Sequence, residues 1–213
     1  MLKVNEVFHS IQGESTYAGL PTVFVRLTGC HLRCHYCDTQ YAYFEGEKRS
    51  QEDVLETIAA FNARYVCITG GEPLLQQKAC LSLMTELCNR NYNVSLETSG
   101  AVSIAAVDPR VKIILDIKTP DSGAENSFLF ENLEKINVNT EFKFVICSES
   151  DFHWAESFVR ENKISENHCV LYSPSFGKIS EKWLAKKILS ESSKARLQLQ
   201  LHKYIWSEHQ RGV

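Results

Sequence analysis

The amino-acid sequence predicts an α/β protein with an open, partial barrel of the TIM type, made of about six βα units in a single domain of residues 1–213. Short runs rich in β-branched and aromatic residues alternate with helical stretches, a pattern typical of a mostly parallel sheet. The units are too few to close an eight-stranded barrel. The residues with distinctive chemistry also follow predicted strands, and the functional loops of such barrels lie at the carboxyl ends of their strands.

The expected elements alternate along nearly the whole chain. We expect strands at residues 4–8, 22–27, 65–69, 93–96, 112–116, 141–146 and 169–172, with a weaker one at 197–201. We expect helices at residues 51–62, 75–91, 128–135, 151–161 and 180–190. Residues 119–126, with their proline and glycine, are expected to form a surface excursion.

Two of the helices have clear local signals. Ser50 precedes Gln51-Glu52-Asp53, which gives the first helix a Ser-x-x-Asp cap with acids in its first turn. In the second helix, four apolar residues recur at helical spacing and are expected to face the sheet: Leu75, Ala79, Leu83 and Leu87.

Composition limits the classes of protein that need to be considered. The chain is 44% hydrophobic and 23% charged, which fits a globular domain able to bury its own core. A net charge of −3 argues against a nucleic-acid or anionic-membrane surface. No apolar run approaches the roughly 18 residues of a membrane span, and the N-terminus lacks the apolar core of a signal peptide. Eight cysteines could indicate a secreted disulfide protein, but a core of this size favours a reducing cytoplasm.

Polar motifs follow four consecutive predicted strands. A cysteine-rich loop follows 22–27, and Gly70-Gly71-Glu72-Pro73 follows the next strand. Glu97-Thr98-Ser99-Gly100 and Asp116-Ile117-Lys118-Thr119-Pro120 follow the two after that. Because the carboxyl ends of parallel strands lie on one side of the sheet, these motifs are expected to form one site.

The cysteine loop carries the most specific chemical signal. Cys30, Cys34 and Cys37 are spaced as Cys-x3-Cys-x2-Cys, which could hold three irons of a 4Fe-4S cluster and leave the fourth iron open. A zinc site completed by His31 or His35 remains an alternative, although neither histidine has the usual spacing. Disulfides and simple burial are further alternatives. Burial is the expected role of the isolated cysteines Cys67, Cys80, Cys88, Cys147 and Cys169.

A second polar cluster lies before the cysteines. Amide and carboxylate side chains gather in residues 8–15, ahead of a strand in which alternation places Phe24 and Arg26 on one face. A buried cation needs a partner. The partner of Arg26 could be a substrate carboxylate or an internal bridge to Glu14 or Glu97.

Together, the cysteine spacing, the aromatic Tyr36 before its last member and the downstream Gly-Gly-Glu-Pro run resemble the radical S-adenosylmethionine (SAM) superfamily. The resemblance implies a radical SAM core in which the open iron chelates SAM, whose reductive cleavage yields a 5′-deoxyadenosyl radical. It also implies that Gly70, Gly71 and Glu72 contribute to SAM binding.

Further motifs resemble one family within that superfamily. Ser-Ile-Gln-Gly-Glu, Phe-Val-Arg-Leu-Thr-Gly-Cys, Cys-Asp-Thr, Glu-Thr-Ser-Gly and the terminal Leu-His-Lys-Tyr-Ile-Trp closely resemble the 7-carboxy-7-deazaguanine synthases. The resemblance implies ring contraction of 6-carboxy-5,6,7,8-tetrahydropterin to 7-carboxy-7-deazaguanine with loss of ammonia, a step in queuosine and 7-deazapurine biosynthesis. Hydrogen abstraction at C6 would start the reaction, and SAM would be re-formed.

The same resemblance implies roles for individual residues. The implied substrate contacts are Ile11, Gln12, Gly13, Glu14, Arg26 and Thr98, and the further implied SAM contacts are Tyr36, Asp38, Gly100 and Lys118. Thr39 matches a Mg2+ ligand, in keeping with the preference of that cation for oxygen, although it could also be a simple turn residue. No general acid or base is implied.

The chain departs from the family in one place and is open to two interpretations in another. Many relatives have Ser-Pro-Lys where this chain has Asp116-Ile117-Lys118, so Lys118 could instead pair with Asp116 across one strand face. At the C-terminus, His202, Lys203, Trp206 and Val213 could fold back over the pocket, or Trp206 could anchor a dimer.

A homodimer and a flavodoxin-like electron donor are further family expectations. An activase for a glycyl-radical enzyme and a non-catalytic iron–sulfur protein remain rival functions.

Overall fold

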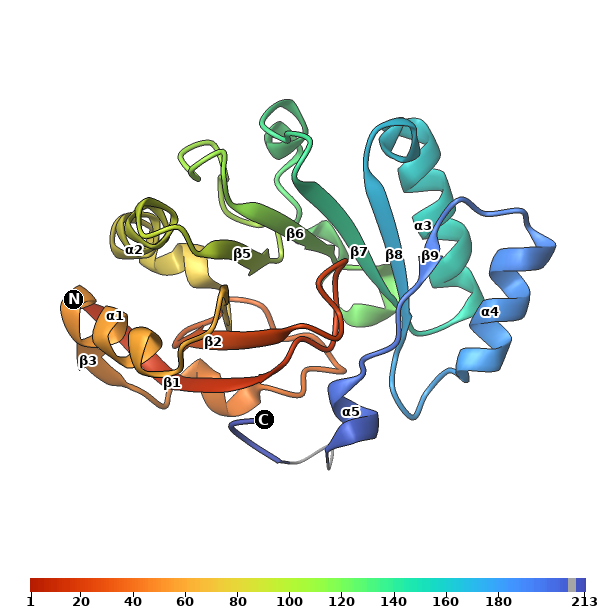
Figure 1. Cartoon of the computed structure of the whole chain (residues 1–213). Helices are drawn as coiled ribbons and strands as arrows, with labels where there is room; N and C mark the ends of the chain where they lie inside the picture. The colour runs from red at the N-terminus through yellow and green to blue at the C-terminus, as the bar shows by residue number, and fades with distance from the viewer. Residues whose placement is uncertain (207–209) are drawn as a thin grey trace.

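The computed structural model describes residues 1–206 and 210–213, and its central feature is a single open sheet (Figure 1). Its nine strands follow the order β3-β1-β2-β4-β5-β6-β7-β8-β9. They are β1 (Leu2–Ile11), β2 (Pro21–Leu27), β3 (Glu47–Arg49), β4 (Tyr65–Gly70), β5 (Asn93–Thr98), β6 (Lys112–Ile117), β7 (Thr140–Ile146), β8 (Cys169–Pro174) and β9 (Arg196–Leu197).

Strand direction divides the sheet into two parts. The strands from β2 through β4, β5, β6, β7 and β8 to β9 are parallel, whereas β1 is antiparallel to both of its neighbours, β2 and β3. The sheet curves into an arc that stays open on one side (Figure 1). The predicted open, mostly parallel α/β barrel is thus confirmed, with an antiparallel hairpin added at its first edge.

The long helices cover the outer side of the arc, and the C-terminal segment lies across its open side (Figure 1). The α-helices are α1 (Gln51–Ala60), α2 (Gln77–Asn89), α3 (Glu149–Glu161), α4 (Glu181–Ser190) and the short α5 (His202–Ile205). Short 3-10 turns are η1 (Gln40–Tyr43), η2 (Pro73–Gln76), η3 (Pro120–Ser122), η4 (Glu125–Ser127), η5 (Phe130–Glu134) and η6 (Ile164–Glu166).

The main hydrophobic core lies between the sheet and the outer helices. Strand residues alternate between this core and the inner side of the arc, as the two-residue period of a strand requires. On β7, the fully buried Phe142 and Phe144 join the core cluster, whereas the side chain of Lys143 takes part in the inner cavity. The inner side can therefore carry charged groups without disrupting the core.

Helix α1 begins as its sequence predicts. Ser50 accepts a hydrogen bond from the backbone N–H of Asp53 at 3.0 Å, and the Asp53 carboxylate accepts one from the Ser50 N–H at 3.1 Å. This reciprocal capping box satisfies two of the backbone donors that a helix start leaves unpaired.

The second helix begins later than its apolar spacing indicates. The 3-10 turn η2 precedes α2, and because a 3-10 turn rotates the chain differently from an α-helix, Leu75 is 47% exposed. The buried face of α2 comprises Cys80, Leu83, Met84, Leu87 and Cys88. The expectation that Leu75 faces the sheet was therefore wrong.

Other local expectations also need correction. The expected helix at 128–135 is only the 3-10 turn η5, and the expected strand at 197–201 is the two-residue β9. The short, wholly polar strand β3 was not anticipated. Residues 119–126 are a surface excursion only in their second half, where Gly123, Glu125 and Asn126 are exposed. In the first half, Thr119 and Ser122 are fully buried, and the Thr119 hydroxyl donates to Asp151 at 2.9 Å.

Within the described part of the chain, no helix has the length and apolar character that a membrane crossing requires.

Candidate active site

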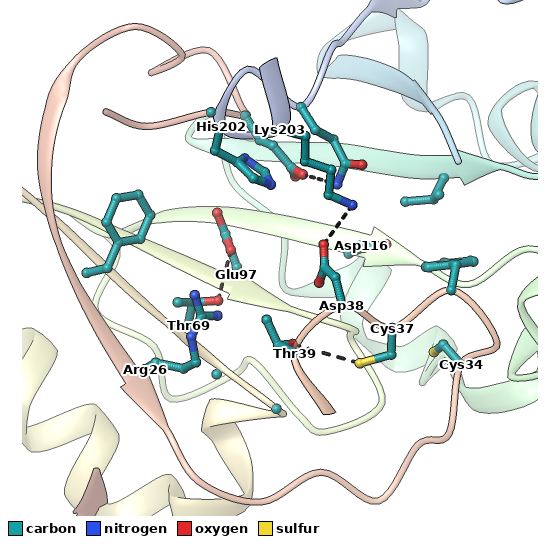
Figure 2. A pocket seen from close by; sticks show the side chains of 18 of the residues that line it. Arg26, Cys34, Cys37, Asp38, Thr39, Thr69, Glu97, Asp116, His202 and Lys203 are labelled. Atoms are coloured by element: carbon teal, nitrogen blue, oxygen red, sulfur yellow. Dashed lines mark hydrogen bonds and ion pairs between the residues drawn. The ribbon is translucent and has the colours of Figure 1, made fainter. Parts of the chain in front are cut away.

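A cavity of about 520 Å³ occupies the inner side of the arc, beside the carboxyl ends of the parallel strands. Its walls come from the β1–β2 loop, the cysteine loop, the strand ends and the C-terminal segment (Figure 2). A cavity of this size suits a small-molecule ligand. The predicted gathering of motifs at one edge of the sheet is what the structure shows.

The three clustered cysteines line this cavity together. Cys30, Cys34 and Cys37 are free and partly buried thiols. Burial raises the pKa values of Cys30 and Cys34, and the nearby ammonium of Lys118 opposes that rise. By contrast, Cys67, Cys80, Cys88 and Cys147 are buried singly, and Cys169 is partly exposed at the start of β8.

The donor set fits a 4Fe-4S cluster. In residues 1–206 and 210–213, no three His, Cys, Asp or Glu side chains lie close enough together to hold one metal ion. A cubane makes a different demand, because each cysteine ligates its own iron and the sulfurs need not meet at one point. Three free thiols from one loop at a cavity satisfy that demand.

The Gly70-Gly71-Glu72-Pro73 loop supports the cysteine loop directly. The Glu72 N–H donates to the Gly29 carbonyl at 2.7 Å. A Cβ at Gly71 would lie 2.7 Å from the Cys30 Cβ and would overlap the Gly29 carbonyl. The missing side chain at Gly71 thus lets two loop backbones approach each other closely.

Two residues of the predicted site do not line the cavity. Glu72 is only 1% exposed, and its carboxylate accepts hydrogen bonds from Thr98 Oγ1 at 2.7 Å and from the Ser99 N–H at 2.9 Å. Gly100 has a φ of +71°, and a Cβ there would lie 2.7 Å from the Phe128 ring. Both residues shape the loops after β4 and β5. The carboxylate of Glu72 is occupied by hydrogen bonds within the protein, and Gly100 leaves the space that the Phe128 ring needs.

The other predicted residues lie together at the cavity wall. They are Ile11, Gln12, Gly13, Glu14, Arg26, Cys30, Cys34, Tyr36, Cys37, Asp38, Thr39, Gly70, Gly71, Thr98 and Lys118.

Arg26 has an internal partner that the sequence did not suggest. Its Nε donates to Glu6 Oε1 at 2.7 Å, and the Tyr41 hydroxyl donates to the same oxygen at 2.9 Å. Burial opposes the charge of Arg26, but Tyr41 and Glu6 beside it raise its pKa above the ordinary value. The partner is therefore neither Glu14 nor Glu97, since Glu6 lies beside Arg26 on the paired strand β1.

Glu97 instead holds other side chains of the cavity wall by hydrogen bonds (Figure 2). Its carboxylate accepts a hydrogen bond from Thr69 Oγ1 at 2.9 Å and one from Gln12 Nε2 at 3.4 Å. These contacts join the ends of β4 and β5 to the β1–β2 loop.

The C-terminal segment closes part of the cavity, as one of the two interpretations held. Lys203 forms an ion pair with Asp38 at 2.8 Å (Figure 2). His202 packs against Gly13. Burial opposes ionisation of Asp38, but Lys203 and His202 hold its pKa below the ordinary value. Val213 also lines the cavity, whereas Trp206 is 37% exposed.

Tyr36 has an unused polar group beside the cysteines. Its hydroxyl is buried and has no hydrogen-bond partner among the described residues. Burial raises its pKa, and the Lys118 ammonium lies 5.6 Å from its ring centroid. This hydroxyl is therefore free to form a hydrogen bond with a group that enters the cavity.

Sequence reasoning missed two charged residues of the cavity wall, Lys143 and Arg211. Lys143 forms ion pairs with Glu14 and, at 3.3 Å, with Asp116. Asp116 also pairs with Lys118 at 3.0 Å, as the strand-face argument allowed. The signal was present in the strand 141–146, where a lone lysine alternates with phenylalanines.

Comparisons with known proteins agree with this fold and site. Residues 24–139 match the family model described as the radical SAM superfamily. An open αβ barrel with a three-cysteine loop at its strand ends defines that class, and the chain is a member of it. Membership implies a 4Fe-4S cluster and SAM, which the donor set fits.

The curated relatives narrow the class further. The chain is 42% identical to a 7-carboxy-7-deazaguanine synthase of Chlorobaculum tepidum, over 100% of this chain and 97% of that protein. It is 38% identical to one of Koribacter versatilis, over 100% of both chains. The chain belongs to the 7-carboxy-7-deazaguanine synthase family.

A solved structure shares the fold. The crystal structure of QueE from Escherichia coli superposes with a TM-score of 0.74 at 24% identity, covering 93% of each chain.

Proposed function

We propose that this chain is a radical SAM carbon–nitrogen lyase that converts 6-carboxy-5,6,7,8-tetrahydropterin to 7-carboxy-7-deazaguanine with loss of ammonia. The single observation that carries the proposal is one cavity shared by the cysteine loop and by the polar residues Gln12, Glu14 and Arg26. Its full-length relatives carry the name of that activity. The product places the enzyme in queuosine and 7-deazapurine biosynthesis.

The cysteine side of the cavity would bind the cofactors. Cys30, Cys34 and Cys37 would hold the cluster, and bound SAM would supply the radical that removes a hydrogen atom from substrate C6. Tyr36, Asp38 and Lys118 line this side together with the Gly70–Gly71 backbone. The unpartnered Tyr36 hydroxyl supports a ligand there. Glu72 and Gly100 would act only by shaping the loops.

The opposite side would bind the pterin. This side presents both hydrogen-bond donors and hydrogen-bond acceptors, which suits a heterocycle that carries several of each. The residues are Ile11, Gln12, Gly13, Glu14 and Thr98. Arg26 would bind the substrate carboxylate through its terminal nitrogens, since its Nε is held by Glu6. No side chain is assigned as general acid or base.

Thr39 would contribute one oxygen to a Mg2+ ion. Thr39 lines the cavity, and its Oγ1 lies 3.8 Å from Cys37 Sγ. Mg2+ keeps several waters and needs few protein ligands, so the substrate carboxylate and water could complete its octahedron.

Partners and compartment are further proposals. The exposed Tyr204, Ile205 and Trp206 support a homodimer contact next to the closing segment. A flavodoxin-like donor would supply electrons to the cluster. The eight free thiols support a reducing cytoplasm.

Anaerobic reconstitution tests the proposal. The purified chain receives iron, sulfide, a low-potential reductant, SAM and 6-carboxytetrahydropterin, and mass spectrometry follows the products. We expect 7-carboxy-7-deazaguanine and one ammonia per turnover, with many turnovers per SAM. A fully loaded enzyme that forms no deazapurine, or that consumes SAM stoichiometrically, contradicts the proposal.

The control variant is Cys34→Ala. It should lose both the 4Fe-4S absorbance and the product, since two cysteines hold a cubane poorly. Unaltered iron content in this variant would show that Cys34 is not a ligand.

A further inference from the structure

Lys143 is a buried cation to which neither the fold nor the proposed function assigns a role. It lies in the middle of β7 and is only 7% exposed. A buried ammonium is costly unless it is paired and hydrogen-bonded. Lys143 pairs on one side with Glu14 of the β1–β2 loop and on the other with Asp116, whose Oδ2 lies 3.3 Å from its Nζ.

Strand register fixes one of these two pairs. Asp116 and Lys143 are direct partners in the parallel β6–β7 ladder, so their side chains emerge side by side from rigid backbone. Glu14, by contrast, lies in a loop and needs side-chain contacts to hold it. Lys143 and Gln200 provide them, with Gln200 Nε2 donating to Glu14 Oε1 at 2.7 Å.

The pairs join into a chain of alternating charge across the cavity wall. Glu14, Lys143, Asp116 and Lys118 follow one another, and Lys118 lies 5.6 Å from the Tyr36 ring. One end of this chain is on the pterin side, and the other end is beside the cysteine loop. With two cations and two anions it is neutral as a whole, so removing one member leaves an uncompensated buried charge.

The groups that face Glu14 and Lys143 come from several elements. Glu14 faces Lys143 from β7 and His202 from α5; burial opposes its ionisation, but these two groups lower its pKa. Lys143 faces Glu14, Asp116 and Glu97; burial disfavours its charge, but these three carboxylates raise its pKa. Lys143, on strand β7, is therefore the cation that stabilises the ionised form of the Glu14 carboxyl.

We propose that Lys143 is a positioning residue that holds Glu14 and Asp116 in one arrangement and thereby couples pterin binding to SAM binding. The inference rests on the proposed function, because it takes Glu14 as a pterin contact and Lys118 as a SAM contact. Coupling between two sites is reciprocal, so each ligand tightens the binding of the other by the same factor.

Equilibrium dialysis of 6-carboxypterin against the anaerobically reconstituted enzyme, with and without SAM, measures this coupling without turnover. In the wild type, SAM should tighten pterin binding several-fold. In Lys143→Met, the pterin Kd should rise at least about tenfold and the effect of SAM should disappear. Lys143→Arg, which keeps the charge, should recover most of both. Two results overturn the inference: a wild type in which SAM does not change the pterin Kd, or a Lys143→Met protein in which SAM tightens pterin binding as much as in the wild type.

A pH series separates positioning from general stability. Without Lys143 the pKa of Glu14 should rise, so pterin affinity in Lys143→Met should increase with pH across the neutral range, whereas the wild type should show little change there. A parallel pH dependence in both proteins contradicts the inference.

Two variants guard against a folding defect. Asp116→Asn breaks the link to Lys118 but keeps the Glu14–Lys143 pair, so pterin should bind with near wild-type affinity while the SAM effect is lost. Lys112→Met removes another largely buried lysine, which pairs with Glu141 at 2.6 Å outside the cavity. It should change neither binding nor coupling. A Lys112→Met protein that matches Lys143→Met overturns the inference.

Product formation by the wild type distinguishes this inference from the proposed function. If the wild type forms deazapurine and Lys143→Met binds like it, only the inference fails. If the wild type shows the expected coupling but forms no deazapurine, only the proposed function fails. A wild type that neither binds 6-carboxypterin nor forms deazapurine overturns both.

Discussion

At the scale of single residues, the site depends on groups that fix the direction of its charges. Glu6 holds the Nε of Arg26 and also accepts the Tyr41 hydroxyl. Among the residues that the structure describes, none takes the two terminal nitrogens of Arg26. A guanidinium held by one edge presents a fixed fork, which is the geometry that binds a carboxylate in two places.

Glu6→Gln should weaken substrate binding without changing cluster content. Loss of a charge-assisted hydrogen bond costs about 1.5–3 kcal/mol, so the KM for 6-carboxytetrahydropterin should rise roughly tenfold to a hundredfold, with a smaller change in kcat. Steady-state kinetics and iron analysis provide the check. Tyr41→Phe, which leaves the Arg26–Glu6 bond in place, should have a smaller effect. An unchanged KM in Glu6→Gln would mean that Arg26 does not depend on this anchor.

At the scale of elements, the loop after β4 is a support for the cysteine loop. The Gly71 N–H donates to the Leu27 carbonyl at 3.2 Å, and the Glu72 N–H donates to the Gly29 carbonyl at 2.7 Å. On the far side of the cysteine loop, the His35 N–H donates to the Ser122 carbonyl at 2.9 Å. The three-cysteine loop is thus held between the loops that follow β4 and β6.

Gly71→Ala should impair cluster assembly in a folded protein. The added methyl would lie 2.7 Å from the Cys30 Cβ, so the cysteine loop must shift. We expect iron per chain after reconstitution to fall at least about twofold, while circular dichroism stays unchanged; local overpacking costs typically 1–3 kcal/mol.

Gly177→Ala is the matched control. A Cβ at Gly177 meets no heavy atom within 4 Å, although its φ of +72° makes the substitution mildly strained. It should lose a little stability and no iron. Full iron loading of Gly71→Ala would contradict the supporting role of this loop.

At the scale of the whole molecule, the arc separates an apolar outer core from a charged inner side. The buried ion pairs of Lys143 lie on that inner side, and the C-terminal segment covers it through Lys203 and Asp38. Charges shielded in this way interact strongly, because little water screens them. The same arrangement makes the stability of the protein depend on the ionisation of its carboxylates.

Stability should therefore fall in acid. Burial opposes the ionisation of Glu14 and Asp116, but their lysine partners lower both pKa values below the ordinary 4.5 and 3.8. A carboxylate with a depressed pKa in the folded state stabilises the protein above its unfolded pKa, and this contribution is lost as pH falls through the lower folded value. Urea unfolding should show this loss below about pH 4.5.

The double variant Glu14→Gln, Asp116→Asn isolates these two groups from the other carboxylates. Compared in the cluster-free state, it should lose less stability than the wild type between pH 5 and about pH 3. Parallel curves for the two proteins would show that Glu14 and Asp116 do not contribute to the acid sensitivity.

Local signals explain which parts of the fold could be predicted. Ser50 and Asp53 specify the start of α1 within four consecutive residues, so that start was predicted correctly. The strands β2 and β4 to β8 are short runs of β-forming residues and were predicted to within two residues of their ends, whereas β1 extends beyond the predicted 4–8 on both sides. The face of α2 was assigned wrongly because the 3-10 turn η2 changed the rotation at Leu75. The three-residue strand β3 carries no apolar alternation, so only its pairing with β1 defines it.

The 4Fe-4S and SAM chemistry and the family could be predicted from sequence, because the cysteine spacing, the Gly-Gly-Glu-Pro run and the residues around Arg26 are contiguous motifs. Tertiary structure alone decided which charges meet. Glu6 and Arg26 are brought together by strand pairing, Asp116 and Lys143 by the β6–β7 register, and Asp38 and Lys203 by the closing segment. The physical reason is that a local motif fixes the ligands on one loop, whereas the energy of a buried charge depends on partners that are distant in sequence.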